Sequence, residues 1–130
     1  MRTIFIAGNA LVDEDSIPLK LMPFLKKEFP LIDFIEFDPT ENFPESNEPN
    51  GEFCLIDTVK GINEPLIFTD IDKFVNKKGI SMHDFDIAWE MKLLKKLGKL
   101  KEVSIIGIPQ KSDMREGQIL KMTADLIRKL

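Results

Sequence analysis

Three side chains of this sequence have the chemistry of metal ligands and lie where local structure is expected to change. They are Asp15, Asp57 and His83, the last being the only histidine of the chain, in Ser81-Met82-His83-Asp84. Each aspartate stands where a short apolar run stops. A neutral imidazole and two carboxylates at strand ends can converge on a divalent metal or polarise a peptide bond. Which of these they do decides the function.

Each of the three residues also has a structural interpretation. Asp15 belongs to Asp13-Glu14-Asp15 before an expected helix start, where it could cap the helix or interact favourably with its dipole. Asp57 ends an apolar strand, where a carboxylate next to the core needs a cation or backbone donors. His83 precedes a helix and could be structural there. Together the three residues indicate a functional site more strongly than any one alone, since three separate structural explanations would otherwise have to coincide at one edge of the sheet.

The elements that position these residues follow from the apolar pattern. β-branched and aromatic runs alternate with amphipathic segments of helical spacing, which predicts a mostly parallel sheet covered on both faces. We expect one α/β domain over residues 1–130, a three-layer α/β/α sandwich. The expected strands are 3–7, 34–37, 53–56, 66–68 and 103–108, and the expected helices follow Ser16 and cover 84–97 and 116–130.

Some segments carry more specific expectations. Pro23 would cost a hydrogen bond inside the first helix, so we expect a kink there or a helix that becomes regular only near Met22. Asp38–Gly51 lacks periodicity and reads as a surface loop. In an open parallel sheet, ligands bind beyond the carboxyl ends of the strands. All three candidate ligands are expected at that edge.

Composition excludes several classes of protein. The 130 residues contain one cysteine, Cys54, in an apolar run, so an internal disulfide and a cysteine-rich zinc site are excluded and a buried thiol is expected. Residues 1–70 carry 5 basic and 14 acidic side chains, whereas residues 71–130 carry 13 basic and 8 acidic ones. The lysines of the second half are spread along amphipathic helices, which favours a solvated face over a nucleic-acid partner. No apolar run fits a signal peptide or a membrane span, so we expect a cytoplasmic protein.

Common catalytic motifs are missing. Gly8-Asn9 is not part of a Gly-x-Gly-x-x-Gly fingerprint, and neither a phosphate-binding loop nor His-Glu-x-x-His occurs. Serine catalysis would have to combine His83 with a serine that has no nucleophile context. Trp89, four residues after Phe85, is interpreted as a core residue, with a partner-facing anchor as the alternative.

The chain resembles the hydrogenase maturation endopeptidases, which trim the C-terminal extension of the large subunit of nickel-iron hydrogenases. The resemblance covers nearly the whole chain. Its motifs are the segment 8–15 (Gly-Asn-Ala-Leu-Val-Asp-Glu-Asp), Leu55-Ile56-Asp57, Ser81-Met82-His83-Asp84 and Ile105-Ile106-Gly107-Ile108-Pro109. Each motif is degenerate, and their order and spacing carry the resemblance. The fold it implies is the phosphorylase/hydrolase-like sandwich of these proteases.

The resemblance implies that Asp15, Asp57 and His83 are metal ligands. It also implies that they sense nickel already inserted in a hydrogenase large-subunit precursor, with no organic cofactor and no need for a resident metal. Glu14 is the alternative to Asp15 as the inward-pointing acid. Ser16 and Pro18 replace the usual glycines of the family, and the segment 38–51 is shorter than the helix usual at that place.

Peptide hydrolysis is the chemistry expected of this site, with Asp57 or a metal-bound water as the base. Oxygen and imidazole donors suit nickel and zinc equally, so ligand type alone does not select nickel. Two other classes stay open. A non-catalytic assembly chaperone would hold a metalloprotein tail without cutting it, and a flavodoxin-like module would bind flavin or nucleotide.

Overall fold

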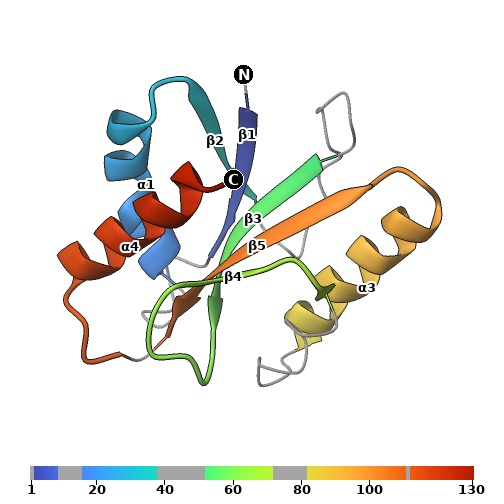
Figure 1. Ribbon diagram of the computed structural model, residues 1–130. Coiled ribbons are helices and arrows are strands. Elements are labelled where there is room, and N and C mark those ends of the chain that lie inside the picture. The colour runs from blue at the N-terminus through green and yellow to red at the C-terminus, as the bar shows by residue number, and fades with distance from the viewer. Residues whose placement is uncertain (1, 9–15, 38–51, 72–81, 111) are drawn as a thin grey trace.

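The fold was determined as a computed structural model, which describes residues 2–8, 16–37, 52–71, 82–110 and 112–130 (Figure 1). The side chains of residue 37 and of residues 82–88 lie outside that description. The elements, in chain order, are β1 (Arg2–Ala7), α1 (Ile17–Glu28), β2 (Ile32–Phe37), β3 (Glu52–Val59), β4 (Leu66–Phe68), α3 (Met82–Lys96), β5 (Glu102–Pro109) and α4 (Glu116–Arg128). The predicted loop over 38–51 lies outside the described residues.

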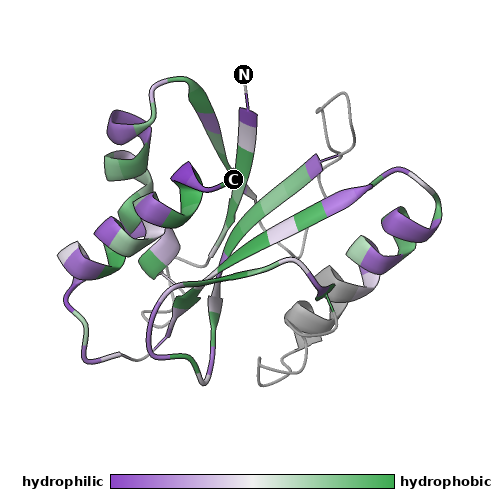
Figure 2. Cartoon of the chain, viewed as in Figure 1, coloured by the Kyte–Doolittle hydropathy of each residue, from purple (hydrophilic) through white to green (hydrophobic). Residues whose placement is uncertain are grey.

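The strands form one five-stranded sheet in the order β2-β1-β3-β5-β4. The first four are parallel, and β4 pairs antiparallel with β5 at the edge. The expectation of a mostly parallel α/β sheet is therefore confirmed, as is the added strand at 66–68. The strands are mostly apolar, as Figure 2 shows, because both faces of the sheet are covered, and several charged residues lie at the strand starts.

Helices α1 and α4 cover one face of the sheet and α3 lies on the other (Figure 1). Alternate strand residues point to opposite faces, so each face has its own core. The core under α1 and α4 includes Ile4, Ile6, Cys54, Ile56, Ile106 and Ile108 with Leu21, Leu25, Ile119 and Ile127 from the helices. The core on the α3 side includes Phe5, Ala7, Phe53, Leu55, Val59 and Ile105 with Met91 and Leu100.

β3 is longer than the sequence predicts. The apolar run suggested an end at Ile56, whereas the strand continues to Val59 and pairs with β5 along its whole length. Thr58 and Val59 are β-branched and lie opposite Ile108 and Pro109, which extends the ladder. The prediction that Asp57 directly follows the strand is therefore wrong.

The first helix also differs from the expectation. α1 is one helix from Ile17 to Glu28 with Pro23 inside it, so a start of regular helix near Met22 is wrong. Pro23 is on the exposed side, while Leu21 and Leu25 are buried against the sheet on either side of it. Burial of two leucines, at roughly 1.5–3 kcal/mol each, offsets a proline cost of about 3 kcal/mol. Ser16 occupies the N-cap position but makes no capping bond through its side chain.

α3 begins two residues earlier than predicted and ends at Lys96, one residue before the predicted end. After Lys96 the Lys99 N–H donates to the Leu94 carbonyl and the Gly98 N–H to the Lys95 carbonyl. Gly98 has φ +76°, so this is a Schellman C-cap that depends on a residue without Cβ. None of the helices in the described part of the chain has both the length and the apolar composition to span a membrane.

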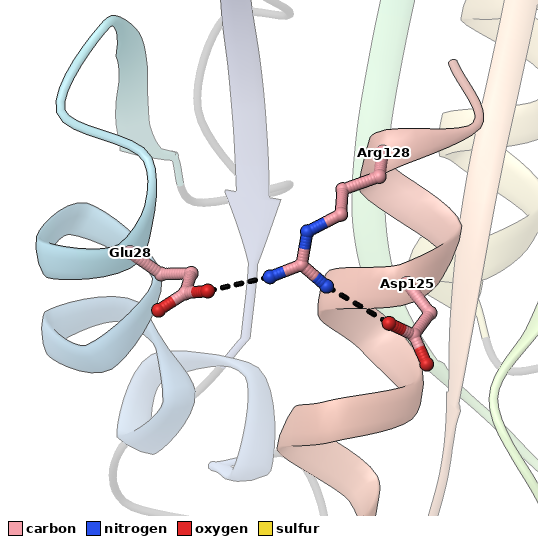
Figure 3. Close-up of polar contacts among 3 residues, drawn as sticks. All are labelled: Glu28, Asp125 and Arg128. Atoms are coloured by element: carbon pink, nitrogen blue, oxygen red, sulfur yellow. Dashed lines mark hydrogen bonds and ion pairs between the residues drawn. The ribbon is translucent and has the colours of Figure 1, made fainter.

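One arginine joins the two helices on the same face. Arg128 of α4 donates to Glu28 of α1 and to Asp125 one turn earlier in α4 (Figure 3). The guanidinium carbon also lies 5.4 Å from the centre of the Phe29 ring, at the end of α1. The planar guanidinium can serve all three partners at once. Arg128 therefore fixes the ends of α1 and α4 relative to each other.

Candidate functional site

Asp57 is the member of the predicted ligand set whose side chain the structure describes, and it is buried. It is 3 % exposed and lies on β3 between Leu55 and Val59, on the face that α3 covers. The Thr58 N–H donates to its Oδ1 at 2.8 Å. Among the described residues no buried side-chain nitrogen or oxygen lacks a hydrogen-bond partner, so the fold accommodates this carboxylate. A bond to the adjacent backbone fixes the orientation of the carboxylate at the sheet.

Small residues flank Asp57 on both neighbouring strands. Gly107 of β5 is its register partner. On the other side the register of Phe5 with Leu55 and of Ile6 with Ile56 brings Ala7 alongside it. A Cβ at Gly107 would meet Val59 Cγ2 at 2.8 Å, so the Val59 side chain can pack closely against β5 only because residue 107 has no side chain. No role at the site was predicted for Gly107, although a glycine within a β-branched run indicates a close approach.

The path of the chain determines at which edge of the sheet α1 begins. β1 and β2 are adjacent and parallel, so α1 must begin at the carboxyl edge of the sheet and return to the amino edge. Asp15 and Glu14 precede that beginning directly, and they lie outside the described residues. Their distance to Asp57 stays a prediction.

His83 is the second residue of α3, in its first turn, rather than before the helix as predicted. The C-terminus of α3 is followed by β5 at the amino edge, and in Figure 1 the helix begins near the edge to which the parallel strands run. α3 also covers the face on which Asp57 lies. The imidazole itself is outside the described residues, so convergence of His83 with Asp57 stays a prediction too.

The described side chains alone do not form a metal site. No group of three or more histidine, cysteine, aspartate or glutamate side chains within residues 2–8, 16–37, 52–71, 89–110 and 112–130 could hold an ion. Of the predicted ligand set, only Asp57 has a described side chain. The chemistry available is that of one oriented carboxylate, to which a second carboxylate would add a hard oxygen donor and an imidazole a borderline nitrogen donor.

Two other features are separate from this edge. Cys54 is buried on the opposite face, and burial raises its pKa to about 12 despite the opposing effect of Arg2. The prediction of a buried small thiol is confirmed, and Cys54 is no nucleophile at neutral pH. A groove of about 480 Å³ runs between α1 and α4, with Phe24 and Leu120 at its apolar part and none of the predicted ligands in its lining.

Solved structures share this architecture across almost the whole chain. No protein-family model and no curated protein sequence matches the chain. The hydrogenase maturating endopeptidase HybD from E. coli superposes with a TM-score of 0.66 at 14 % identity, covering 99 % of this chain and 93 % of that one. An endopeptidase from Escherichia coli superposes with a TM-score of 0.58 at 16 % sequence identity, covering 99 % of this chain and 93 % of that one. A hydrogenase 2 maturation peptidase from a Thaumarchaeota archaeon superposes with a TM-score of 0.53 at 15 % sequence identity, covering 99 % of this chain and 97 % of that one. The chain therefore has the fold of the hydrogenase maturation endopeptidases, as its motifs predicted.

Proposed function

We propose that this protein is an endopeptidase that removes the C-terminal tail of a nickel-iron hydrogenase large-subunit precursor. In this proposal Asp15, Asp57 and His83 engage nickel that the precursor carries, and the tail is thereby placed for cleavage. Glu14 is the alternative to Asp15. The shared fold and the motif order support the proposal.

The observation that carries the proposal is the burial of Asp57. Among the described residues it is the only buried one with a charged side chain. Transfer of an ionised carboxylate out of water costs several kcal/mol after relaxation, and apolar residues at such positions stabilise as well or better. The other residues of β3 on that face, Phe53, Leu55 and Val59, follow this rule. A carboxylate at this buried position therefore favours a role in binding or chemistry.

The chemistry requires polarisation of the scissile carbonyl and activation of a water, both of which a divalent ion supplies when bound. Asp57 contributes a negative oxygen whose orientation the Thr58 N–H fixes. His83 would contribute a neutral imidazole nitrogen and Asp15 a second carboxylate. Because these ligand types suit zinc as well as nickel, selectivity for nickel over zinc would come from the metal that the precursor presents.

Cleavage of purified precursor tests the proposal. Nickel-loaded and nickel-free precursor are incubated with the chain, and the released tail is followed by mass spectrometry. We expect cleavage of the loaded form only, and loss of cleavage in Asp57→Asn, His83→Ala and Asp15→Asn. Asp33→Asn is the matched control, because Asp33 is an exposed aspartate on β2.

The outcomes separate the alternatives. Equal cleavage of both precursors would refute the metal-sensing role of the three residues. Binding of the nickel-loaded precursor without release of a tail would instead identify a non-catalytic assembly chaperone. Purification of the chain with flavin or nucleotide would favour a ligand-binding module.

A further inference from the structure

Three large apolar side chains on α3 and directly after its end face solvent. Trp89 is 60 % exposed, Leu93 41 % and Leu97, directly after the helix, 62 %. The interpretation of Trp89 as a core residue is therefore wrong. The opposite side of α3 is anchored, because Met91 is fully buried and Leu94 packs against the core. These three residues, here called the α3 ridge, are an apolar surface that the fold of the described chain leaves uncovered.

The spacing of the α3 ridge indicates the shape of what covers it. Its members are four residues apart, so they lie in a single row about 12 Å long. Such a row is the ridge that fits the groove between corresponding rows on a second helix. Tryptophan and its apolar neighbours also dominate the energetics of protein interfaces.

Charge indicates the chemistry of that helix. Lys92 and Lys96, one turn apart, border the α3 ridge on one side, and both are exposed. Within residues 89–101 five lysines stand against one glutamate, Glu90, a net charge of +4. A partner that covers the α3 ridge must therefore bring acidic side chains to the lysine row.

Other occupants fit less well. A second copy would bring a segment 89–101 of the same net charge, +4, against this one. A bilayer needs a broad apolar face on a helix lying in the membrane surface, whereas α3 offers a row one side chain wide and has its other side fixed in the core. We propose that the α3 ridge is a docking surface for an amphipathic helix of another protein that carries glutamate or aspartate beside its apolar groove. This proposal is independent of the proposed peptidase function.

Fluorescence tests it directly, since Trp89 is the only tryptophan and the chain has no tyrosine. The probe is a synthetic helical peptide with a leucine face bordered by glutamates. A peptide with the same face bordered by lysines is the control. We expect a saturable blue shift of Trp89 emission with the first and at least about tenfold weaker binding of the second.

Matched variants tie the shift to the α3 ridge. Leu97→Asp should weaken binding at least about tenfold, whereas Leu31→Asp, at a leucine 79 % exposed after α1, should not. Lys96→Glu should weaken binding of the acidic peptide, whereas Lys20→Glu on α1 should not. Leu93→Gln is the second ridge variant, and unchanged circular dichroism confirms folding of each.

Several results would overturn the proposal. These are no shift with the acidic peptide, equal binding of both peptides, and an equal effect of Leu31→Asp and Leu97→Asp. A shift produced only by phosphatidylserine vesicles would identify a membrane surface instead. A shift produced by raising the protein concentration alone would identify self-association.

Discussion

A methyl group added at Gly107 would test the packing beside Asp57. Its Cβ would lie 2.8 Å from Val59 Cγ2, 3.0 Å from Phe68 Cε2 and 3.4 Å from Ile62 Cδ1. These three side chains are buried in the core on the α3 side, so none of them can move into solvent. Overpacking of this kind costs about 1–3 kcal/mol. We expect Gly107→Ala to lower the free energy of unfolding by that amount.

Two other glycines make the test specific. Gly98 has φ +76° and nothing within 4 Å of an added Cβ, so Gly98→Ala should cost about 1 kcal/mol through backbone strain alone. Gly117 is in the first turn of α4, also with open space around an added Cβ. Gly117→Ala should therefore stabilise the protein by about 0.5 kcal/mol, because alanine favours the helix. Urea unfolding followed by circular dichroism measures all three at an unchanged m-value.

A double-mutant cycle separates the steric cause from the conformational one. Val59→Ala removes the methyl group nearest to the added Cβ, so Gly107→Ala should cost at least about 0.5 kcal/mol less in that background. Gly98→Ala should cost the same in both backgrounds. Additive energies for Gly107 and Val59, or a Gly107→Ala chain as stable as the parent, would refute this account of the site's packing.

The remaining predictions concern the buried groups and the helix clamp. Asp57→Ala should cost about 1–3 kcal/mol in urea unfolding because the Thr58 N–H loses its acceptor, whereas Asp57→Asn keeps an acceptor oxygen and should lose cleavage without that cost. Cys54 should react with a thiol reagent at pH 8 only after unfolding. Burial raises the pKa of this thiol from 9.0 to about 12, so the stability that the protonated thiol contributes is full below pH 9 and falls as the pH rises toward 12. The difference in unfolding free energy between the parent chain and Cys54→Ala, followed against pH, measures this contribution. Arg128→Lys should cost less than about 1 kcal/mol, since the pairs with Glu28 and Asp125 are about half exposed; a larger loss in urea unfolding would contradict this.

Strand positions were predictable from the sequence because a parallel sheet is covered on both faces. Its strands therefore need apolar side chains on both sides. Apolar runs such as Thr3–Ala7 and Val103–Ile108 identify such strands without any knowledge of their neighbours. The end of β3 was not predictable in this way. Whether Asp57 and Thr58 continue a strand depends on pairing with β5, and that pairing is a property of the folded sheet.

Helix faces were only partly predictable. α3 has two apolar rows, one with Met91 and Leu94 and one with Trp89, Leu93 and Leu97. Periodicity locates both rows and assigns Met91 and Leu94 correctly to the core, but hydrophobicity favours burial of tryptophan as well. The sheet offers α3 one face, so only one row can be buried. The exposure of the other is therefore information that the structure alone provides.

The candidate site illustrates the same division between local and tertiary information. Asp57 was identifiable as a candidate because a carboxylate directly after the apolar run 53–56 needs a cation or backbone donors. The small neighbours Ala7 and Gly107 were not identifiable as part of the site, because only the strand order places β1 and β5 on either side of β3. With these two flanking it, the carboxylate lies two residues inside the end of β3, so a bound group must reach over the edge of the sheet to meet it. In the proposed function, the nickel that the precursor carries would have to meet that requirement.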